Sequence, residues 1–276
     1  MTSEGTRATA RAEERSAPGR RAPAIAIDDL SVVFEGGVTA IERLDLTVYD
    51  EEFLVVLGPS GCGKSTLLLV LAGLIRPTSG AVRVHGRVNP PPGKDRGFVF
   101  QQAGLLPWFD VLTNIELGLR AKGLSRTEAR AISQPLARKF GLEGFEHKYP
   151  HQLSGGMQQR VGVARAFAID PPILLMDEPF GALDAQTRVL LQEELIRLWE
   201  GSHKTVVFVT HSIDEAIFLA DRIMVMQARP GRVLEMVNVP LPRPRGDRTR
   251  QQPEYLALQS RLWEMLRSEA ERAFVD

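Results

Sequence analysis

The chain is nearly free of cysteine and carries no net charge, and each absence excludes a class of protein. Its one cysteine, Cys62, can form neither an internal disulfide nor a cysteine-based metal site, which indicates a reducing compartment. The 34 basic residues are balanced by 34 acidic ones. Because a nucleic-acid-binding protein normally has a basic excess that neutralises phosphates, we expect no nucleic acid among the partners.

Long apolar segments are also missing. The longest uninterrupted one, residues 67–75, has about half the ~20 residues that a membrane-spanning helix needs, so we expect no membrane span. Residues 2–24 contain no Val, Ile, Leu or aromatic side chain, but five arginines and three glutamates. This stretch lacks the apolar part of a secretion signal. It predicts a disordered tail over residues 1–24 of a protein that stays on the cytoplasmic side of the membrane.

The rest of the sequence alternates short apolar runs with helical patterns. Two runs of alternating apolar residues, 25–27 and 44–48, indicate half-buried strands, and residues 111–140 have a helical pattern. Four further runs are typical of strands in a parallel sheet that is covered on both faces: residues 53–57, 173–176, 206–209 and 223–226. The sequence therefore predicts an α/β core that is interrupted by a helical insertion.

Composition also sets the expected domain boundaries. We place the globular domain at residues 25–239, with a helical subdomain at about 103–160 that contains a capping box, Ser125 with Glu128. Four prolines and four arginines at residues 240–253 predict a linker or an extended surface strap. Residues 254–276 are expected to form an amphipathic helix that packs on the parent domain through a stripe of apolar side chains: Tyr255, Leu258, Leu262 and Leu266.

Residues 58–66 form a phosphate-binding loop in its proper context. They fit the pattern G-x-x-x-x-G-K-[ST] and lie between a predicted strand and a predicted helix at 67–74. Glycines let backbone N–H groups surround a triphosphate, Lys64 reaches the β- and γ-phosphates, and the Ser65 hydroxyl ligates Mg²⁺. The nucleotide-binding residues that this predicts are Gly58, Pro59, Ser60, Gly61, Cys62, Gly63, Lys64, Ser65 and Thr66.

Two carboxylates follow the apolar run at residues 173–176. Asp177, at the end of the predicted strand, is suited to hold the metal ion, and Glu178 is suited to polarise the attacking water. An acidic turn after a strand is common by itself. Together with the phosphate loop upstream, the pair indicates a protein that hydrolyses a nucleoside triphosphate.

A second phosphate-binding helix start distinguishes this chain from other proteins with such a loop. The segment Leu153-Ser154-Gly155-Gly156 offers a hydroxyl and exposed N–H groups at the positive end of a predicted helix, 23 residues before Asp177. Here the sequence resembles the ATP-binding subunits of ABC transporters, over roughly residues 25–238. Met157 stands where this family more often has glutamine, and we expect the difference to be tolerated.

The resemblance implies a fold and further site residues. The implied fold is α/β, a P-loop NTPase core of the ABC ATPase type with an antiparallel β subdomain and a helical subdomain. Gln101 would contact Mg²⁺ and the water, His211 would contact the γ-phosphate, and Asp184 would belong to the D-loop. Phe34 falls where the family stacks an aromatic ring under adenine, although plain core packing is an alternative for it. The cofactors implied are ATP and Mg²⁺.

Cys62 lies inside the phosphate loop, near the start of the following helix. That position can lower the pKa of a thiol. The sequence therefore predicts that alkylation of Cys62 inhibits ATP hydrolysis and that bound ATP protects the thiol. The alternative is that Cys62 only fills space.

The resemblance also implies partners. Two copies of the chain would pair head to tail, each binding ATP between its own phosphate loop and the partner copy's Ser154-Gly155-Gly156. The homodimer would dock on two transmembrane permease subunits, which serve a solute-binding protein. An apolar patch after Gln101, made of Leu105, Leu106 and Trp108, either contacts the permease or packs inside the helical subdomain.

Two short segments, Leu-Leu-Pro-Trp at 105–108 and Arg-Pro-Gly-Arg at 229–232, resemble the nitrate, sulfonate and taurine group of importers. Residues 92–97 favour taurine or a related sulfonate, while nitrate and thiamine precursors stay open. A soluble ABC-type ATPase is the alternative class, but the neutral charge and the single nucleotide domain count against it. A metabolic kinase does not explain Ser154-Gly155-Gly156.

Overall fold

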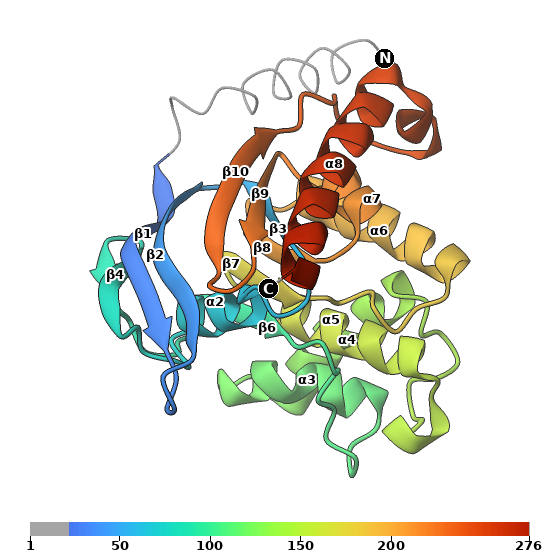
Figure 1. Cartoon of the computed structure of the whole chain (residues 1–276). Coiled ribbons are helices and arrows are strands. Elements are labelled where there is room, and N and C mark those ends of the chain that lie inside the picture. Colours follow the sequence, from blue (N-terminus) through green and yellow to red (C-terminus); the bar gives the residue numbers. More distant parts are fainter. Residues whose placement is uncertain (1–21, 276) are drawn as a thin grey trace. The chain divides into compact units, whose positions relative to one another are not determined.

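The computed structural model describes residues 22–275, so the tail expected over residues 1–24 lies outside the described residues apart from its last three (Figure 1). The chain divides into two compact units. The first consists of Met1–Pro91 and Thr205–Asp276, and the second of Pro92–Lys204. No helix within residues 22–275 is long and apolar enough to cross a membrane.

An antiparallel sheet forms one part of the first unit. Its strand order is β2-β1-β4-β5, and every neighbouring pair is antiparallel. The predicted strands at 25–27 and 44–48 are confirmed as parts of two long strands. Their alternating apolar side chains are buried as predicted: Ile25, Ile27, Leu44, Leu46 and Val48. The strands are β1 (Pro23–Val33), β2 (Thr39–Tyr49), β4 (Ser79–Val84) and β5 (Arg87–Val88).

The other strands of the first unit follow one another in the order β10-β9-β3-β8. β3 is parallel to both β8 and β9, whereas β10 is antiparallel to β9. All residues of β3 and β8 are buried, as their unbroken apolar runs predict. The strands are β3 (Phe53–Leu57), β8 (Thr205–Thr210), β9 (Arg222–Gln227) and β10 (Arg232–Asn238).

Two helices pack on these strands. α2 (Lys64–Leu71) contacts β8, and α7 (Ile213–Leu219) contacts β3 and β8. The helix expected at 67–74 therefore starts and ends three residues earlier than predicted. It ends there because Gly73 adopts a left-handed φ of 76°, which breaks the helix at low cost for glycine.

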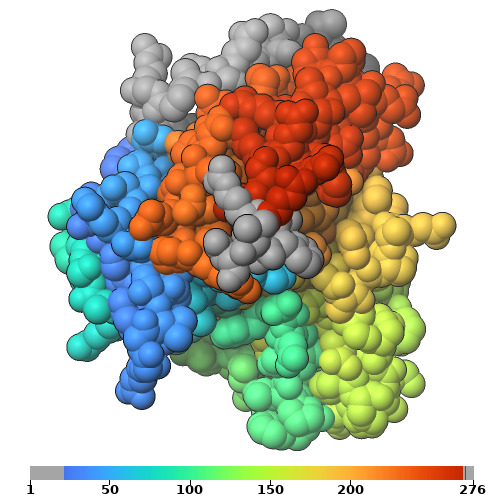
Figure 2. Space-filling view, in the orientation of Figure 1, coloured from blue at the N-terminus to red at the C-terminus, as the bar shows by residue number. Residues whose placement is uncertain are grey.

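The carboxyl-terminal part of the first unit is closely packed. The Pro/Arg-rich segment continues into a 3₁₀ helix, η3 (Asp247–Gln251), and then into α8 (Pro253–Val275). The expected amphipathic helix is thus observed, with Tyr255 and Leu262 buried and with α7 as its packing partner. On the surface, α8 runs beside β10 (Figure 2). An ion pair joins Arg261 of α8 to Glu235 of β10.

The second unit combines a parallel strand pair with helices. β6 (Arg96–Val99) pairs with β7 (Ile173–Asp177), and α5 (Gly155–Ala168) packs on β6. Helices α3 (Val111–Ala121) and α4 (Arg126–Lys139) pack on each other and on α5. The predicted capping box of Ser125 and Glu128 is present at the start of α4. The remaining elements are η2 (Pro150–Gln152) and α6 (Ala185–Glu200).

Candidate nucleotide site

The phosphate loop connects β3 to α2, and its geometry requires glycine. Gly61 and Gly63 have φ values of 81° and 89°, in the left-handed region that glycine enters without strain. A side chain at Gly63 would also collide with β2, because its Cβ would lie 2.7 Å from the carbonyl oxygen of Ala40. The loop backbone therefore approaches the neighbouring strand in a way that no other residue type allows.

Lys64 is buried at the mouth of this loop and is only 5% exposed. Its ammonium group donates to the carbonyl oxygens of Gly58, at 2.9 Å, and of Pro59, at 2.8 Å. The cation is thus held beside the amino-terminal end of α2, where the helix dipole also favours negative charge. Ser65 follows in the first turn of the same helix and is exposed to solvent. This arrangement suits a polyphosphate.

The structure corrects the expected chemistry of Cys62. The side chain is fully buried, and this burial raises the pKa of the Cys62 thiol although the Lys64 ammonium group opposes the shift. The prediction of a lowered pKa at the helix start was wrong, because the loss of hydration outweighs the nearby positive charge. Packing against Gly58, whose Cβ would lie 2.8 Å from the Cys62 Sγ atom, explains the small side chain.

We expect the Cys62 thiol to react slowly with an alkylating reagent such as iodoacetamide. Only the thiolate reacts, and at a given pH its fraction is smaller for a thiol with a raised pKa. The rate measured by mass spectrometry between pH 7 and 10 should rise along a curve displaced to higher pH than that of a short unstructured peptide carrying one cysteine. If the curve lay at the same pH as that of the peptide, or at lower pH, the burial of Cys62 would be contradicted.

The turn before β10, at Gly231, packs against the phosphate loop and β2. Gly231 donates from its N–H to the carbonyl of Ala40, at 3.1 Å, and accepts from the N–H of Glu42, at 2.9 Å. A Cβ atom at Gly231 would lie 2.6 Å from the oxygen of Ala40 and even closer to the carbonyl oxygen of Cys62. The sequence showed this turn only as a point of family resemblance, because nothing local indicates that residues 62 and 231 touch.

Replacing Gly231 with Ala is expected to weaken ATP binding and to destabilise the first unit. The added methyl group forces the backbone at Cys62 to move, and overpacking of this kind costs about 1–3 kcal/mol. ATP affinity measured by fluorescence titration, together with the thermal unfolding midpoint, checks this. Gly246→Ala is the matched control, because a Cβ atom there would meet nothing within 4 Å. Equal effects of the two substitutions would refute the proposed contact.

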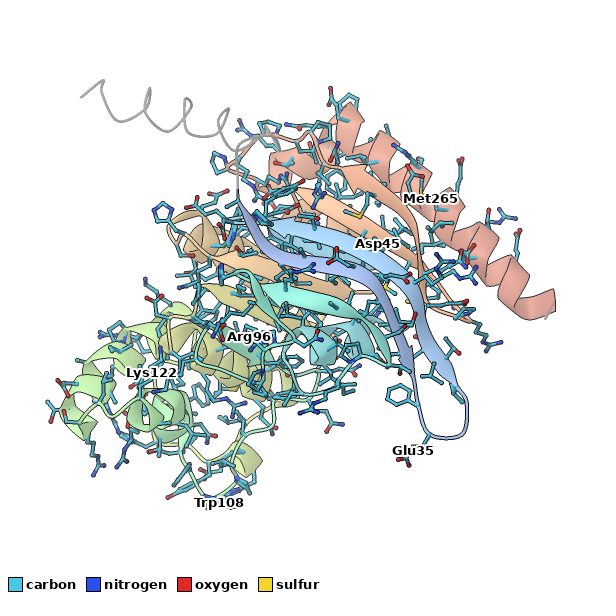
Figure 3. All side chains as sticks on the ribbon, turned by 90° about the vertical axis from the view of Figure 1, so that its left-hand side faces the viewer. Glu35, Asp45, Arg96, Trp108, Lys122 and Met265 are labelled. Atoms are coloured by element: carbon cyan, nitrogen blue, oxygen red, sulfur yellow. The ribbon has the colours of Figure 1, made fainter. Side chains whose placement is uncertain are left out.

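Phe34 lies at the base of the hairpin that joins β1 to β2. Its N–H donates to the carbonyl of Val38, at 2.9 Å, and its side chain is 42% exposed. Plain core packing is therefore excluded, because much of the residue is accessible to solvent. Figure 3 labels Glu35, the next residue, at the tip of this hairpin. The hairpin's second strand, β2, is the strand that the phosphate loop touches at Ala40.

His211 directly follows β8, and its neighbours are fixed by side-chain hydrogen bonds. The Thr210 hydroxyl donates to the carboxylate of Glu215, at 2.6 Å, and accepts from the N–H of Ser212, at 3.0 Å. Ser212 in turn caps α7 by accepting from the N–H of Glu215, at 3.4 Å. The backbone on both sides of His211 is thereby tied to the first turn of α7.

In the second unit, the two predicted carboxylates stand at the end of β7. Asp177 is buried, whereas Glu178 is partly exposed. Glu178 has a φ of 43°, an unusual value for a residue other than glycine and one often found at functional positions. The amide of Gln101 donates to the Glu178 carboxylate at 3.5 Å. The fold therefore brings together two of the predicted site residues that are 77 positions apart.

Helix α5 holds the loop that carries Gln101. The Gln159 amide donates to the carbonyl of Phe100, at 3.0 Å. The Arg165 guanidinium donates to the carbonyls of Ala103, at 2.7 Å, and Gly104, at 2.9 Å. Sequence reasoning missed both positioning residues, since a polar side chain on a helix gives no signal of the distant carbonyl that it will meet.

The helix start predicted at Ser154 is present at the beginning of α5. The Ser154 hydroxyl caps the helix by accepting from the N–H of Met157, at 3.3 Å. A Cβ atom at Gly155 would meet nothing within 4 Å, so space lies open beside this backbone. Gly156 is tighter, because its Cβ would lie 2.8 Å from a methyl group of Leu183. This glycine therefore lies against Leu183, the residue before Asp184.

Asp184, the predicted D-loop residue, caps α6. Its carboxylate accepts from the N–H of Thr187, at 2.9 Å, and this hydrogen bond lowers the pKa of the Asp184 carboxyl group. The side chain is therefore kept ionised and oriented. The residue before Asp184 is fixed as well, because the Arg188 guanidinium donates to the carbonyl of Leu183, at 2.9 Å.

Comparison with known proteins agrees with this geometry. The ABC transporter family model matches residues 41–181. An uncharacterized ABC transporter ATP-binding protein of Methanocaldococcus jannaschii is 51% identical over 246 residues, which cover 88% of this chain and 91% of that protein. The taurine import ATP-binding protein TauB of Rhizobium johnstonii is 48% identical over 212 residues, covering 75% and 81%.

Solved structures give the same result for the fold. One solved structure is the dimeric, post-hydrolysis state of an ATP-binding cassette bound to ADP and Pi. Its chain is 35% identical to this one with a TM-score of 0.72, and the matched part covers 78% of this chain and 98% of the other. The fold is thus a P-loop NTPase core of the ABC ATPase type with an antiparallel β subdomain and a helical subdomain. The chain belongs to the ABC transporter family and is an ATP-binding subunit of an ABC transporter.

Proposed function

We propose that this subunit hydrolyses ATP to drive the import of a small anion, taurine or another sulfonate, across the membrane. The observation that carries the proposal is the 48% identity with a taurine import ATP-binding protein over three quarters of the chain. The Leu-Leu-Pro-Trp and Arg-Pro-Gly-Arg segments support the same importer group. The solute-binding protein and the permease select the cargo, so the sequence of this subunit leaves other substrates of the same importer group open. Nitrate is the next candidate among them.

The site residues divide the hydrolysis reaction among them. Lys64 and the N–H groups of residues 58–66 bind the phosphates, and Phe34 stacks on adenine. Glu178 takes a proton from the attacking water, which Gln101 helps to orient, and His211 contacts the γ-phosphate.

Three of the predicted site residues offer ligands suited to Mg²⁺. Ser65, Gln101 and Asp177 present hydroxyl, amide and carboxylate oxygens, the hard donors that Mg²⁺ prefers. The Asp177 carboxylate at the end of β7 fits such a role, since carboxylate oxygens are among the ligands that Mg²⁺ prefers. When bound, the ion neutralises charge on the β- and γ-phosphates.

We propose a head-to-tail homodimer in which Ser154, Gly155 and Gly156 bind the ATP held by the partner copy. Two observations support this. The open space beside Gly155 leaves room for a phosphate group, and the positive end of α5 attracts its negative charge. The related ATP-binding cassette with ADP and Pi is itself a dimer. Closure would depend on ATP, and hydrolysis would reopen the dimer.

The loop around Trp108 is the surface that we assign to the permease. Figure 3 places Trp108 at the outer edge of the second unit, and its side chain is 65% exposed. Asn114, which is fully buried, holds this loop through hydrogen bonds with the N–H and C=O of Leu106 and with the carbonyls of Phe109 and Asp110, at 2.9–3.2 Å. A rigid loop with an exposed aromatic side chain is typical of an interface. Docking there would place the subunit peripherally on the cytoplasmic face of the membrane.

Co-purification from detergent-solubilised membranes tests the transporter assignment. The tagged subunit is expected to bring down two permease subunits, and the Trp108→Glu variant is expected to lose them while it keeps its ATPase activity. Trp263→Glu is the matched control, because this tryptophan is equally exposed, at 62%, but lies on α8. Recovery of the subunit with ribosomes, DNA or no partner would remove the transport function and leave the soluble ATPase alternative.

The substrate is tested on the solute-binding protein that belongs to the recovered permease. Calorimetric titration with taurine, an alkyl sulfonate and nitrate should show the tightest binding for one of the two sulfonates. Tight binding of nitrate alone would keep the importer and replace its proposed cargo.

A further inference from the structure

Residues 243–259 contact one short helix of the first unit at both of its ends. This carboxyl-terminal extension lies beyond the residues matched by the family model, 41–181. The helix that it contacts is α7, which begins two residues after His211. α7 and α8 lie side by side in Figure 1. The contacts come from five side chains that we call the C-terminal clamp: Arg243, Arg245, Arg250, Tyr255 and Gln259.

Two arginines of the clamp pair with the carboxyl-terminal end of α7. Arg245 is only 6% exposed, and it donates to the carbonyls of Ile217, Phe218 and Ala220 at 2.7–3.1 Å. Arg243 donates to the carbonyl of Leu219 at 2.7 Å. The last carbonyls of a helix have no partner within the helix, and they carry its negative end. The arginines satisfy these groups and so hold this end of α7.

Two residues of α8 pair with the other end of α7. The Tyr255 hydroxyl donates toward the backbone oxygen and the carboxylate of Asp214, at 3.2 Å each. The Gln259 amide donates to the same carboxylate at 2.9 Å. Burial and the neighbouring Asp214 raise the pKa of Tyr255, so the hydroxyl keeps the proton that it donates. Asp214 is only three residues from His211.

The remaining member of the clamp contacts the side of α7. The guanidinium of Arg250 lies 4.2 Å from the centre of the Phe218 ring. With the arginines at one end and α8 at the other, α7 is held along its whole length. His211 then lies between Thr210, which is bonded to Glu215 of α7, and Asp214, which is bonded to α8. We therefore expect any displacement of α7 to displace His211 as well.

We propose that the C-terminal clamp positions His211 for ATP hydrolysis through α7, with Tyr255 and Gln259 as positioning residues. The proposal rests on the proposed role of His211 at the γ-phosphate. It requires that loosening the clamp lowers the turnover rate and leaves ATP binding unchanged, because the phosphate loop and Phe34 belong to other elements. The clamp would thus make the extension part of the catalytic unit.

The test is a double-mutant cycle on ATP turnover with the full chain. Tyr255→Phe and Gln259→Leu are expected to lower kcat by about 10-fold together and to change KM for ATP by less than about two-fold, since a small displacement of a catalytic group costs rate rather than binding. In a chain that already carries His211→Ala, the same two substitutions should have no further effect on the single-turnover rate. Tyr49→Phe, in β2, is the matched control for loss of a tyrosine hydroxyl and should leave both constants unchanged.

Each outcome separates the clamp from the proposed site. If His211→Ala alone keeps full activity, the role assigned to His211 is wrong. If His211→Ala is slow and the clamp substitutions slow it again by the same factor, the clamp acts by another route and the inference is overturned. Unchanged kcat in the clamp variants also overturns it. If Tyr255→Phe lowers the thermal midpoint by more than a few degrees, the cycle is completed with Gln259→Leu alone, whose side chain lies closer to the surface.

Discussion

Replacing Glu178 with Gln is expected to lower ATP turnover by about 10²–10⁴-fold and to leave ATP bound, so that a stable dimer accumulates. Glu178 is the carboxylate that we assign to the attacking water, and it lies within 3.5 Å of the Gln101 amide. The glutamine keeps the size of the side chain but cannot accept the proton. Turnover is measured by phosphate release, and dimer formation by size-exclusion chromatography with light scattering in the presence of ATP and Mg²⁺.

Glu143→Gln is the control for this prediction. Glu143 is exposed and belongs to the same unit, so the substitution makes the same change of charge away from the site. We expect wild-type turnover and no trapped dimer. If Glu178→Gln hydrolysed ATP within a few-fold of the wild-type rate, another residue would have to be the base and the assignment at the end of β7 would be wrong.

Replacing Gly155 with Asp is expected to abolish the ATP-dependent dimer without harming the fold of the single subunit. A Cβ atom at this position meets nothing within 4 Å, so we expect the subunit to accommodate the aspartate side chain. A carboxylate at the start of α5 also interacts favourably with the helix dipole, so the thermal midpoint should stay the same or rise. In the proposed dimer, the same carboxylate would face the phosphates of the partner's ATP. We expect turnover to fall by about 100-fold.

The comparison with Gly155→Ala separates charge from size. Alanine adds a methyl group to the same open space and no charge, so turnover should fall far less than with aspartate. In the chain that carries Glu178→Gln, Gly155→Asp should prevent trapping while each subunit still binds one ATP by fluorescence titration. A trapped dimer in that double variant would show that Gly155 does not face nucleotide.

The local pattern predicted most of the secondary structure in the first unit. β3 and β8 are unbroken apolar runs, and both are buried over their whole length. The capping box at Ser125 was also correct, because both of its hydrogen bonds join residues three positions apart. The helix after the phosphate loop was displaced by three residues, since apolar pattern alone does not show that Lys64 is already helical and that Gly73 ends the helix.

Features that depend on burial or on distant neighbours escaped prediction. The pKa of Cys62 is raised, against expectation, because the pattern of the loop does not show how completely the thiol is removed from water. The contact of Gly231 with the phosphate loop and the hydrogen bond of Gln159 to Phe100, next to Gln101, join residues that are far apart in the chain. No local signal marks either of them.

The amino-acid sequence by itself determined the chemical identity of the site. A phosphate loop, a strand that ends in two carboxylates and a second phosphate-binding helix start are local patterns, and their order along the chain identifies the family. Only the tertiary structure decided the surroundings of those residues. They include the burial of Cys62, the hydrogen bond between Gln101 and Glu178, and the C-terminal clamp on α7. Desolvation and side-chain hydrogen bonds depend on distance in space, and folding brings together residues whose separation along the chain gives no hint of it.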